Sequence, residues 1–99
     1  MAQATIVYWR DIPAQVIVKQ GRRTAKRELA PRFQEAIDLA AMRAKAIGTD
    51  AYLADWRRDG GIECGDDLEA EASAWQARIE DEYDNARIEK LVAAKGYDA

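Results

Sequence analysis

The sequence predicts one α+β domain, in which an N-terminal antiparallel β-hairpin packs against about three α-helices, the last of them long. Two short β-branched and aromatic runs, residues 5–9 and 15–19, open the chain. From residue 33 onward, apolar residues recur at helical spacing. The chain has 99 residues, which suffices for one core and not for two, so we expect residues 1–99 to form a single domain.

The two predicted strands are joined by a short turn over residues 10–14. Pro13 fixes the backbone φ angle there, and Asp11 can bond nearby backbone groups. A short connection favours antiparallel pairing of the strands. Because both strands are apolar on both faces, we expect part of the hairpin to be covered on two sides.

Helices are predicted after the hairpin. Thr24 can cap a short helix through Leu29, and Pro31 either starts a new helix or kinks a continuous one. Gly48 is a suitable C-terminal stop for the next helix. The apolar stripe of that helix consists of Phe33, Ile37, Ala40, Ala41, Ala44 and Ile47.

The second half of the chain continues the helical pattern. Thr49 can cap a helix that ends at Gly60 and Gly61, and residues 62–64 can form a brief extended piece. Asp66 and Glu69 match the capping-box pattern D-x-x-E, which predicts a long helix over about residues 67–95. Its apolar stripe is Leu68, Ala72, Trp75, Ile79, Tyr83, Ala86 and Leu91.

The composition excludes several classes of chemistry. The chain has no histidine, which removes the commonest general base and the commonest zinc ligand. Its single cysteine, Cys64, can form neither an internal disulfide nor a cysteine-rich metal site. We therefore expect no enzyme, no catalytic residues, no metal ligands and no cofactor.

The acidic cluster of the chain does not change this expectation. Its residues, Glu63, Asp66, Asp67, Glu69 and Glu71, lack the spacing of an EF-hand, so we interpret them as a solvated helix start. Cys64 lies near that helix start, which favours a thiolate, but the carboxylates disfavour one, so we expect a buried structural thiol.

No apolar run approaches the ~20 residues of a membrane helix, and residues 1–11 do not resemble a signal peptide. We therefore expect a cytoplasmic protein with no membrane contact.

Charge divides the chain into two halves. Residues 1–49 hold nine basic and four acidic residues, for a net charge of +5, whereas residues 50–99 hold six and fourteen, for −8. Such a division indicates partner recognition or self-association, and a homo-oligomer is compatible with it. The alternative is that the two halves neutralise each other within the fold.

A basic segment over residues 19–32 is the main candidate for binding. If residues 24–29 are helical, Arg22 and Lys26, and likewise Arg23 and Arg27, are like-charged neighbours that a partner could compensate. An acidic protein surface, a phosphate-bearing ligand or nucleic acid could do so, as could the acidic last helix. The overall net charge of −3 argues against nucleic acid.

Aromatic residues beside guanidinium groups add a second candidate. Trp9 and Arg10 are adjacent at the hairpin turn, and Trp56 precedes Arg57. Exposed tryptophan and arginine are typical of interface hot spots, although the three tryptophans could equally be core residues. The candidate surface therefore combines Trp9 and Arg10 with the basic segment: Trp9, Arg10, Arg22, Arg23, Lys26, Arg27 and Arg32.

Four runs carry a resemblance to a known family. They are residues 7–16 (VYWRDIPAQV), 22–27 (RRTAKR), 32–38 (RFQEAID) and 50–58 (DAYLADWRR). Together they resemble the small bacterial "virulence factor" domain family, which occurs alone and within conserved virulence factor C proteins. The resemblance implies an accessory role in corrinoid- and folate-linked methyl transfer, within one-carbon and methionine metabolism. It brings no catalytic residues with it.

The leading hypothesis is a non-enzymatic accessory module that docks on a larger cytoplasmic protein, for which the resemblance implies a methyl-transfer enzyme. The alternative is a binder of a phosphorylated or polyanionic small molecule or cofactor through residues 19–32. An enzyme that uses Asp, Glu and Arg alone ranks third, and a nucleic-acid protein fourth. A deep basic pocket would favour the small molecule, and a flat patch with aromatic residues would favour protein docking.

Overall fold

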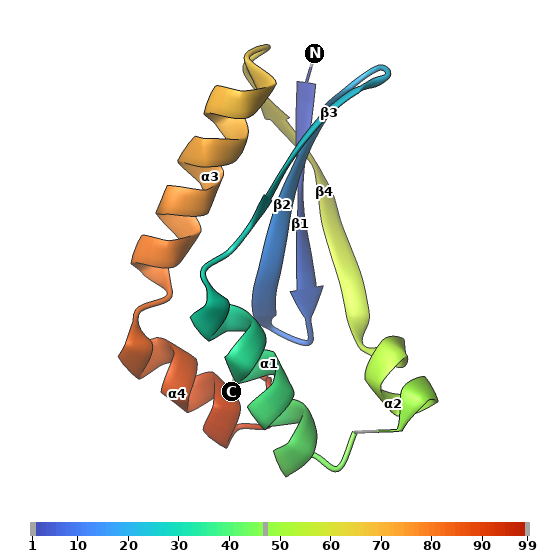
Figure 1. Ribbon diagram of the computed structural model, residues 1–99, viewed down its shortest axis with the longest axis vertical. Coiled ribbons are helices and arrows are strands. Elements are labelled where there is room, and N and C mark those ends of the chain that lie inside the picture. The colour runs from blue at the N-terminus through green and yellow to red at the C-terminus, as the bar shows by residue number, and fades with distance from the viewer. Residues whose placement is uncertain (1, 47, 99) are drawn as a thin grey trace.

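The computed structural model describes residues 2–46 and 48–98 (Figure 1). Its strands are β1 (Ala2–Trp9), β2 (Ile12–Gln20), β3 (Arg23–Glu28) and β4 (Trp56–Cys64). Its helices are α1 (Pro31–Arg43), α2 (Thr49–Ala54), α3 (Leu68–Glu82) and α4 (Asn85–Ala93). The predicted α+β class and the N-terminal hairpin are confirmed.

The strands form one antiparallel sheet in the order β3-β2-β1-β4. The first three strands follow one another as a meander, and β4 returns from beyond α2 to pair with the free side of β1. Across the sheet, Ala4 faces Val18 on β2 and Ile62 on β4, and Val18 faces Ala25 on β3. These partners point to the same side of the sheet, because side chains alternate along a strand.

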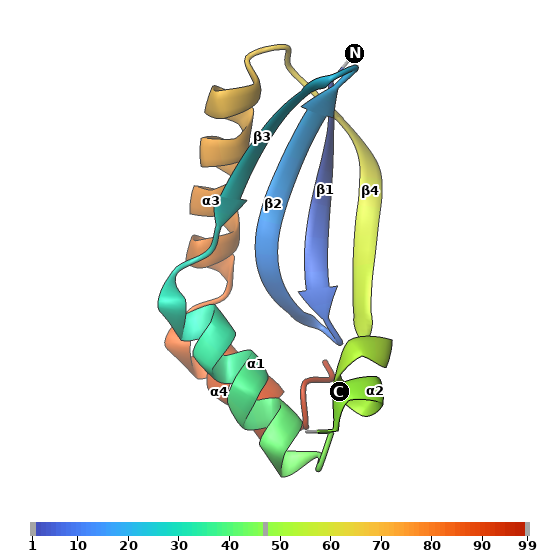
Figure 2. The same cartoon turned by 45° about the vertical axis from the view of Figure 1, so that its right-hand side comes forward.

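That side of the sheet carries the core. α3 lies along it against β2 and β3, while α1 and α4 pack on each other at one end of the sheet (Figure 2). The buried cluster joins Ala2, Ala4, Ile6 and Trp9 of β1 to residues of β2, α1, α3 and α4. The fold therefore has two layers, the sheet and α3, with α1 and α4 packed at one end of the sheet.

α1 follows the predicted apolar stripe. Phe33, Ile37, Ala40 and Ala41 are buried, and Pro31 occupies the first turn, where its missing N–H costs nothing. The helix ends at Arg43 rather than at Gly48, and Ile47 lies outside the described residues.

The predicted helix over residues 24–29 is wrong, because these residues form β3. Its backbone pairs along β2, from Gln20 with Arg23 to Gln15 with Glu28. In a strand, residues four apart are about 13 Å from each other. The inferred repulsion between Arg22 and Lys26, and between Arg23 and Arg27, is therefore absent.

The predicted helix over residues 49–60 is also shorter than expected. α2 ends at Ala54, and the brief extended piece at residues 62–64 is the end of the nine-residue strand β4. Gly60 and Gly61 lie in a bulge of that strand, between the pairs Ala4–Ile62 and Ile6–Asp59. Gly61 has φ +77°, which favours glycine, and a Cβ on Gly60 would lie 2.9 Å from Thr5 Oγ1, so a side chain there would crowd Thr5.

The predicted helix over residues 67–95 is two helices. α3 ends at Glu82, and α4 begins at Asn85, where the Asp84 side chain accepts a hydrogen bond from the Arg87 N–H at 2.8 Å. The capping box is also displaced: Asp67, and not Asp66, is the N-cap of α3 and accepts from the Ala70 N–H at 3.2 Å.

Candidate interaction surface

Trp9 is a core residue and not a surface anchor, which corrects the sequence-based hypothesis. Its side chain is fully buried, stacks on Tyr52 with ring centroids 5.9 Å apart, and donates from Nε1 to the Tyr52 carbonyl at 2.9 Å. On its other side lies Gly96, which has φ +95° and whose Cβ, if present, would lie 2.9 Å from the indole. The C-terminal segment therefore closes over Trp9.

Arg10 also serves the fold. Its guanidinium lies between the rings of Trp9 and Tyr97, 4.7 Å from each centroid. Nε pairs with Asp55 at 3.0 Å, and a terminal nitrogen donates to the Lys95 carbonyl at 2.6 Å. With these groups satisfied and its side chain 12% exposed, Arg10 ties the hairpin turn to α2 and the C-terminal segment.

Arg32 joins α1 to the junction between α3 and α4. Its two terminal nitrogens donate to the carbonyls of Glu80 at 2.7 Å and Tyr83 at 2.5 Å. The last carbonyls of a helix have no partner within the helix, so Arg32 caps the C-terminal end of α3. It is therefore not part of an exposed basic surface.

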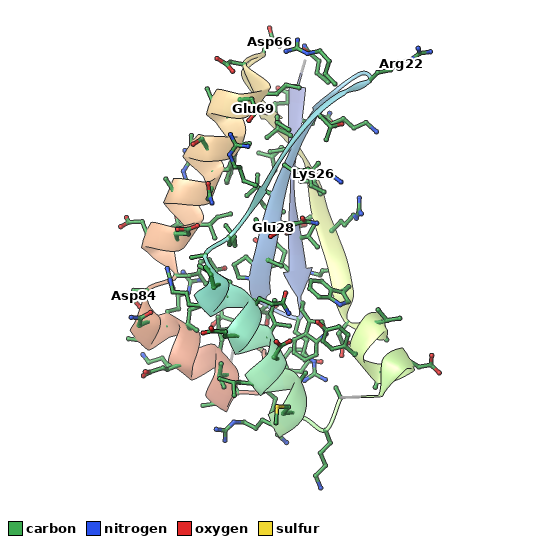
Figure 3. The ribbon with its side chains drawn as sticks, in the orientation of Figure 1. Arg22, Lys26, Glu28, Asp66, Glu69 and Asp84 are labelled. Carbon is green, nitrogen blue, oxygen red and sulfur yellow. The ribbon has the colours of Figure 1, made fainter. Side chains whose placement is uncertain are left out.

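The remaining candidates point in different directions from β3 and its turn. Arg27 pairs with Glu69 of α3 at 2.5 Å, whereas Arg22 lies at the tip of the β2–β3 hairpin and Lys26 lies midway along β3 (Figure 3). Arg22, Arg23 and Lys26 are exposed. The structure thus brings Arg27 to the acidic helix and leaves Lys26 on the opposite side of the sheet.

The side of the sheet away from α3, here called the open sheet face, is the surface that the sequence did not predict. None of the described helices lies along it (Figure 2). The register places one residue set there: Gln3, Thr5, Val7 and Trp9 of β1, Gln15, Ile17 and Lys19 of β2, Thr24, Lys26 and Glu28 of β3, and Trp56, Arg58 and Glu63 of β4. Of these, Trp9 is covered by Tyr52 of α2 at the end of the sheet.

Val7 and Ile17 form the apolar centre of the open sheet face. Each is only 8% exposed, yet neither belongs to the core cluster. Their cross-strand neighbours are long, with Lys26 beside Ile17 and Arg58 beside Val7. Part of the hairpin is therefore buried on both faces, as expected. On this face Tyr52 of α2 covers Trp9, whereas neighbouring side chains and not a second layer cover Val7 and Ile17.

Two adjoining open hollows mark this face. Both are lined by Val7, Gln15 and Trp56, and one extends along Leu29 and Pro31 to the start of α1. Trp56 is half-buried and packs edge-on against Tyr52, with ring centroids 5.8 Å apart, so it has support from α2. The result is an open patch with one anchored aromatic, two aliphatic residues and basic side chains at its margin.

The charge pattern predicts a surface role for Lys26 but not the patch around it. The predicted helix over residues 24–29 is incompatible with the strand register that sets Lys26 beside Ile17. The signal that could have revealed the patch was the alternation of Lys19, Ile17 and Gln15 against Val16 and Val18 on β2.

Cys64 is half-buried at the end of β4. Burial raises the pKa of its thiol, and the carboxylates of Glu71 and Asp66 raise it further. The thiol is therefore protonated near neutral pH, and the electrostatics do not activate it as a nucleophile. Within residues 2–46 and 48–98, no cluster of three or more His, Cys, Asp or Glu side chains could hold a metal ion.

The fold and this surface define a two-layer α+β module with one face of its sheet uncovered. The chain belongs to the virulence factor family, whose model matches residues 7–92. No curated protein and no solved structure matches the chain significantly. Among the described helices, none has the length and apolar character needed to span a membrane.

Proposed function

We propose that the chain is a non-enzymatic accessory module that docks on a larger protein through the open sheet face. The observation that carries this proposal is the apolar centre, Val7 and Ile17, lying outside the core on a face along which no described helix lies. A partner that packs on this face would bury the exposed parts of Trp56 and of the aliphatic stems of Lys26 and Arg58, worth about 25 cal/mol per Å² of apolar area. An open patch with a tryptophan that α2 supports suits a protein better than a small molecule.

The charge around the patch favours an acidic partner. Lys19, Lys26 and Arg58 surround the apolar centre, while Glu28 and Glu63 lie at opposite edge strands. Neither Lys26 nor Arg58 takes part in an ion pair within the described part of the chain. A partner segment with apolar side chains flanked by carboxylates would therefore complement the face.

The family membership supports an accessory role, and the resemblance noted above suggests the class of partner. We propose that the partner is a cytoplasmic methyl-transfer enzyme of corrinoid- or folate-linked metabolism.

The alternative, a polyanion bound by the basic segment, has less support. The hollow that Arg23 lines beside β3 also contains Asp67 and Glu69, whose carboxylates repel an anion. Arg27 is engaged with Glu69, and Lys26 projects from the other side of the sheet. These basic groups do not converge on one point.

The test compares two charge reversals against a partner recovered from native lysate. Lys26→Glu/Arg58→Glu changes the open sheet face, whereas Arg78→Glu/Lys90→Glu changes exposed positions of α3 and α4. We expect the first variant to lose about tenfold or more in affinity, because like charges then meet across the interface. We expect the second to bind like the wild type. Equal binding by both folded variants would refute the proposal.

A further inference from the structure

A second surface lies on the outer side of α1, away from the open sheet face. Here α1 and α4 leave a groove between them, whose apolar residues are Ala36, Leu39, Ile88, Val92 and Ala93. Leu39 is 55% exposed, and Met42, one turn further along α1, is 64% exposed. Large apolar residues this exposed on one helix are unusual for a helix whose opposite side already forms the core.

Four charged residues line the groove: Arg32, Glu35 and Arg43 of α1 and Glu89 of α4. Arg32 is engaged by the carbonyls of Glu80 and Tyr83, whereas Glu35 and Arg43 flank Leu39 along α1. Glu35 precedes Leu39 by four residues and Arg43 follows Leu39 by four. All three therefore lie on one stripe of the helix, with opposite charges at equal distances, about 6 Å, on either side of the leucine.

We propose that this α1–α4 groove is a self-association surface, in which α1 packs antiparallel against α1 of a second copy about a two-fold axis at Leu39. The two leucines then meet at the axis. Glu35 of each copy comes level with Arg43 of the other. A two-fold contact requires the same patch to complement itself, and this stripe does so in its charges.

The charges favour a second copy over a different protein. The groove carries both signs, so a partner of one sign would meet a like charge at one end of the stripe. Within residues 2–46 and 48–98, neither Glu35 nor Arg43 forms an ion pair, so both are available. An interface made of the two α1 helices and the adjoining edge of α4 is small, which predicts a weak, concentration-dependent dimer.

The experiment measures molar mass by light scattering and sedimentation over a series of protein concentrations, with no other protein present. We expect the mass to rise from 11.1 kDa toward twice that value. Arg43→Glu and Glu35→Arg should each shift the transition to at least about tenfold higher concentration, because like charges then face each other twice. The double variant Glu35→Arg/Arg43→Glu should restore the dimer, since it exchanges the charges and keeps the pairing.

A matched pair of leucine variants separates this groove from general hydrophobicity. Leu39→Lys should give a monomer, whereas Leu53→Lys, at an α2 leucine that is 58% exposed, should dimerise like the wild type. Circular dichroism verifies that each variant folds. A wild-type chain that stays monomeric at every concentration would overturn the proposal, and so would a charge exchange that fails to restore the dimer. Either result leaves docking at the open sheet face untouched.

Discussion

Asp67 sets the first turn of α3 with a single carboxylate. Its side chain accepts from the Ala70 N–H, and its own carbonyl accepts from the Glu71 N–H. Asp66, one residue earlier, instead accepts from the Gln20 side chain at an exposed position. Both aspartates precede the same helix, so the sequence pattern alone could not separate the cap from its neighbour.

This difference predicts unequal costs for two alanine variants. Asp67→Ala should destabilise the protein by about 0.5–2 kcal/mol, because a helix N–H loses its acceptor. Asp66→Ala should change the free energy of unfolding by less than about 0.5 kcal/mol. Urea denaturation monitored by circular dichroism measures both. A larger loss for Asp66→Ala would show that the cap is misplaced.

The alkylation rate of Cys64 depends on the charges around its thiol. The raised pKa of its thiol predicts slow alkylation by iodoacetamide at neutral pH, since the thiolate is the reacting form. Glu71→Gln removes a negative charge and keeps an oxygen to accept from the Gly65 N–H. The pKa of the thiol should therefore fall and the alkylation rate should rise. Glu82→Gln, on the last residue of α3, is the control, and equal rates in the two variants would contradict the electrostatic account.

At the scale of elements, the C-terminal end of α3 depends on a residue of α1. Arg32 supplies donors to the carbonyls of Glu80 and Tyr83 at the point where the chain turns into α4. Arg32→Met removes these charged donors but keeps an aliphatic side chain over Phe33.

We expect Arg32→Met to cost about 1–3 kcal/mol, because two carbonyls lose hydrogen bonds to a charged group. Arg22→Met, at the exposed hairpin tip, should cost less than about 0.5 kcal/mol. Denaturation midpoints compare the two variants. If both lose the same stability, Arg32 does not cap α3.

The elements that the sequence predicted well are those with a full apolar pattern. The first two strands and α1 carry enough buried residues to show their period, and Pro31 marks a helix start. The prediction for β3 was wrong because this edge strand has a single buried residue, Ala25, among good helix formers. The prediction for β4 was wrong because its two glycines indicate the end of a helix, although they form a bulge within a strand.

The break between α3 and α4 was missed for a different reason. The apolar stripe continues through Tyr83, so the helical period does not end there. The usable signal was Asp84 before Asn85, since aspartate is a preferred N-cap. Periodicity reports which face is buried, and capping residues report where one helix gives way to another.

At the scale of the whole molecule, the candidate surface could be predicted only in part. Lys26, predicted from its charge, is exposed on the open sheet face, but Trp9, Arg10 and Arg32 hold the hairpin, the C-terminal segment and α3 together. Tryptophan beside arginine describes an interface anchor and a packed core equally well. Only the fold distinguishes them, because burial depends on what a distant segment, here residues 94–98, places over the ring.

The opposite charges of the two halves of the chain are partly paired within the structure and partly left on its surface. Part of it is neutralised internally, through Arg27 with Glu69, an exposed pair that contributes at most about 1 kcal/mol. The rest remains on two separate faces, the basic margin of the open sheet face and the outer side of the helices. These are the two exposed surfaces for which we propose a different protein and a second copy as partners.

Photocrosslinking in the source cells tests the open sheet face most directly. A benzoylphenylalanine replaces Gln15, which lines both hollows, and in a control it replaces Ala77, an exposed residue of α3. Illumination should link the chain to a larger protein from position 15, and the adduct should disappear in the Lys26→Glu/Arg58→Glu background. Adducts from position 77 in place of position 15, or from neither position, would contradict docking through this face.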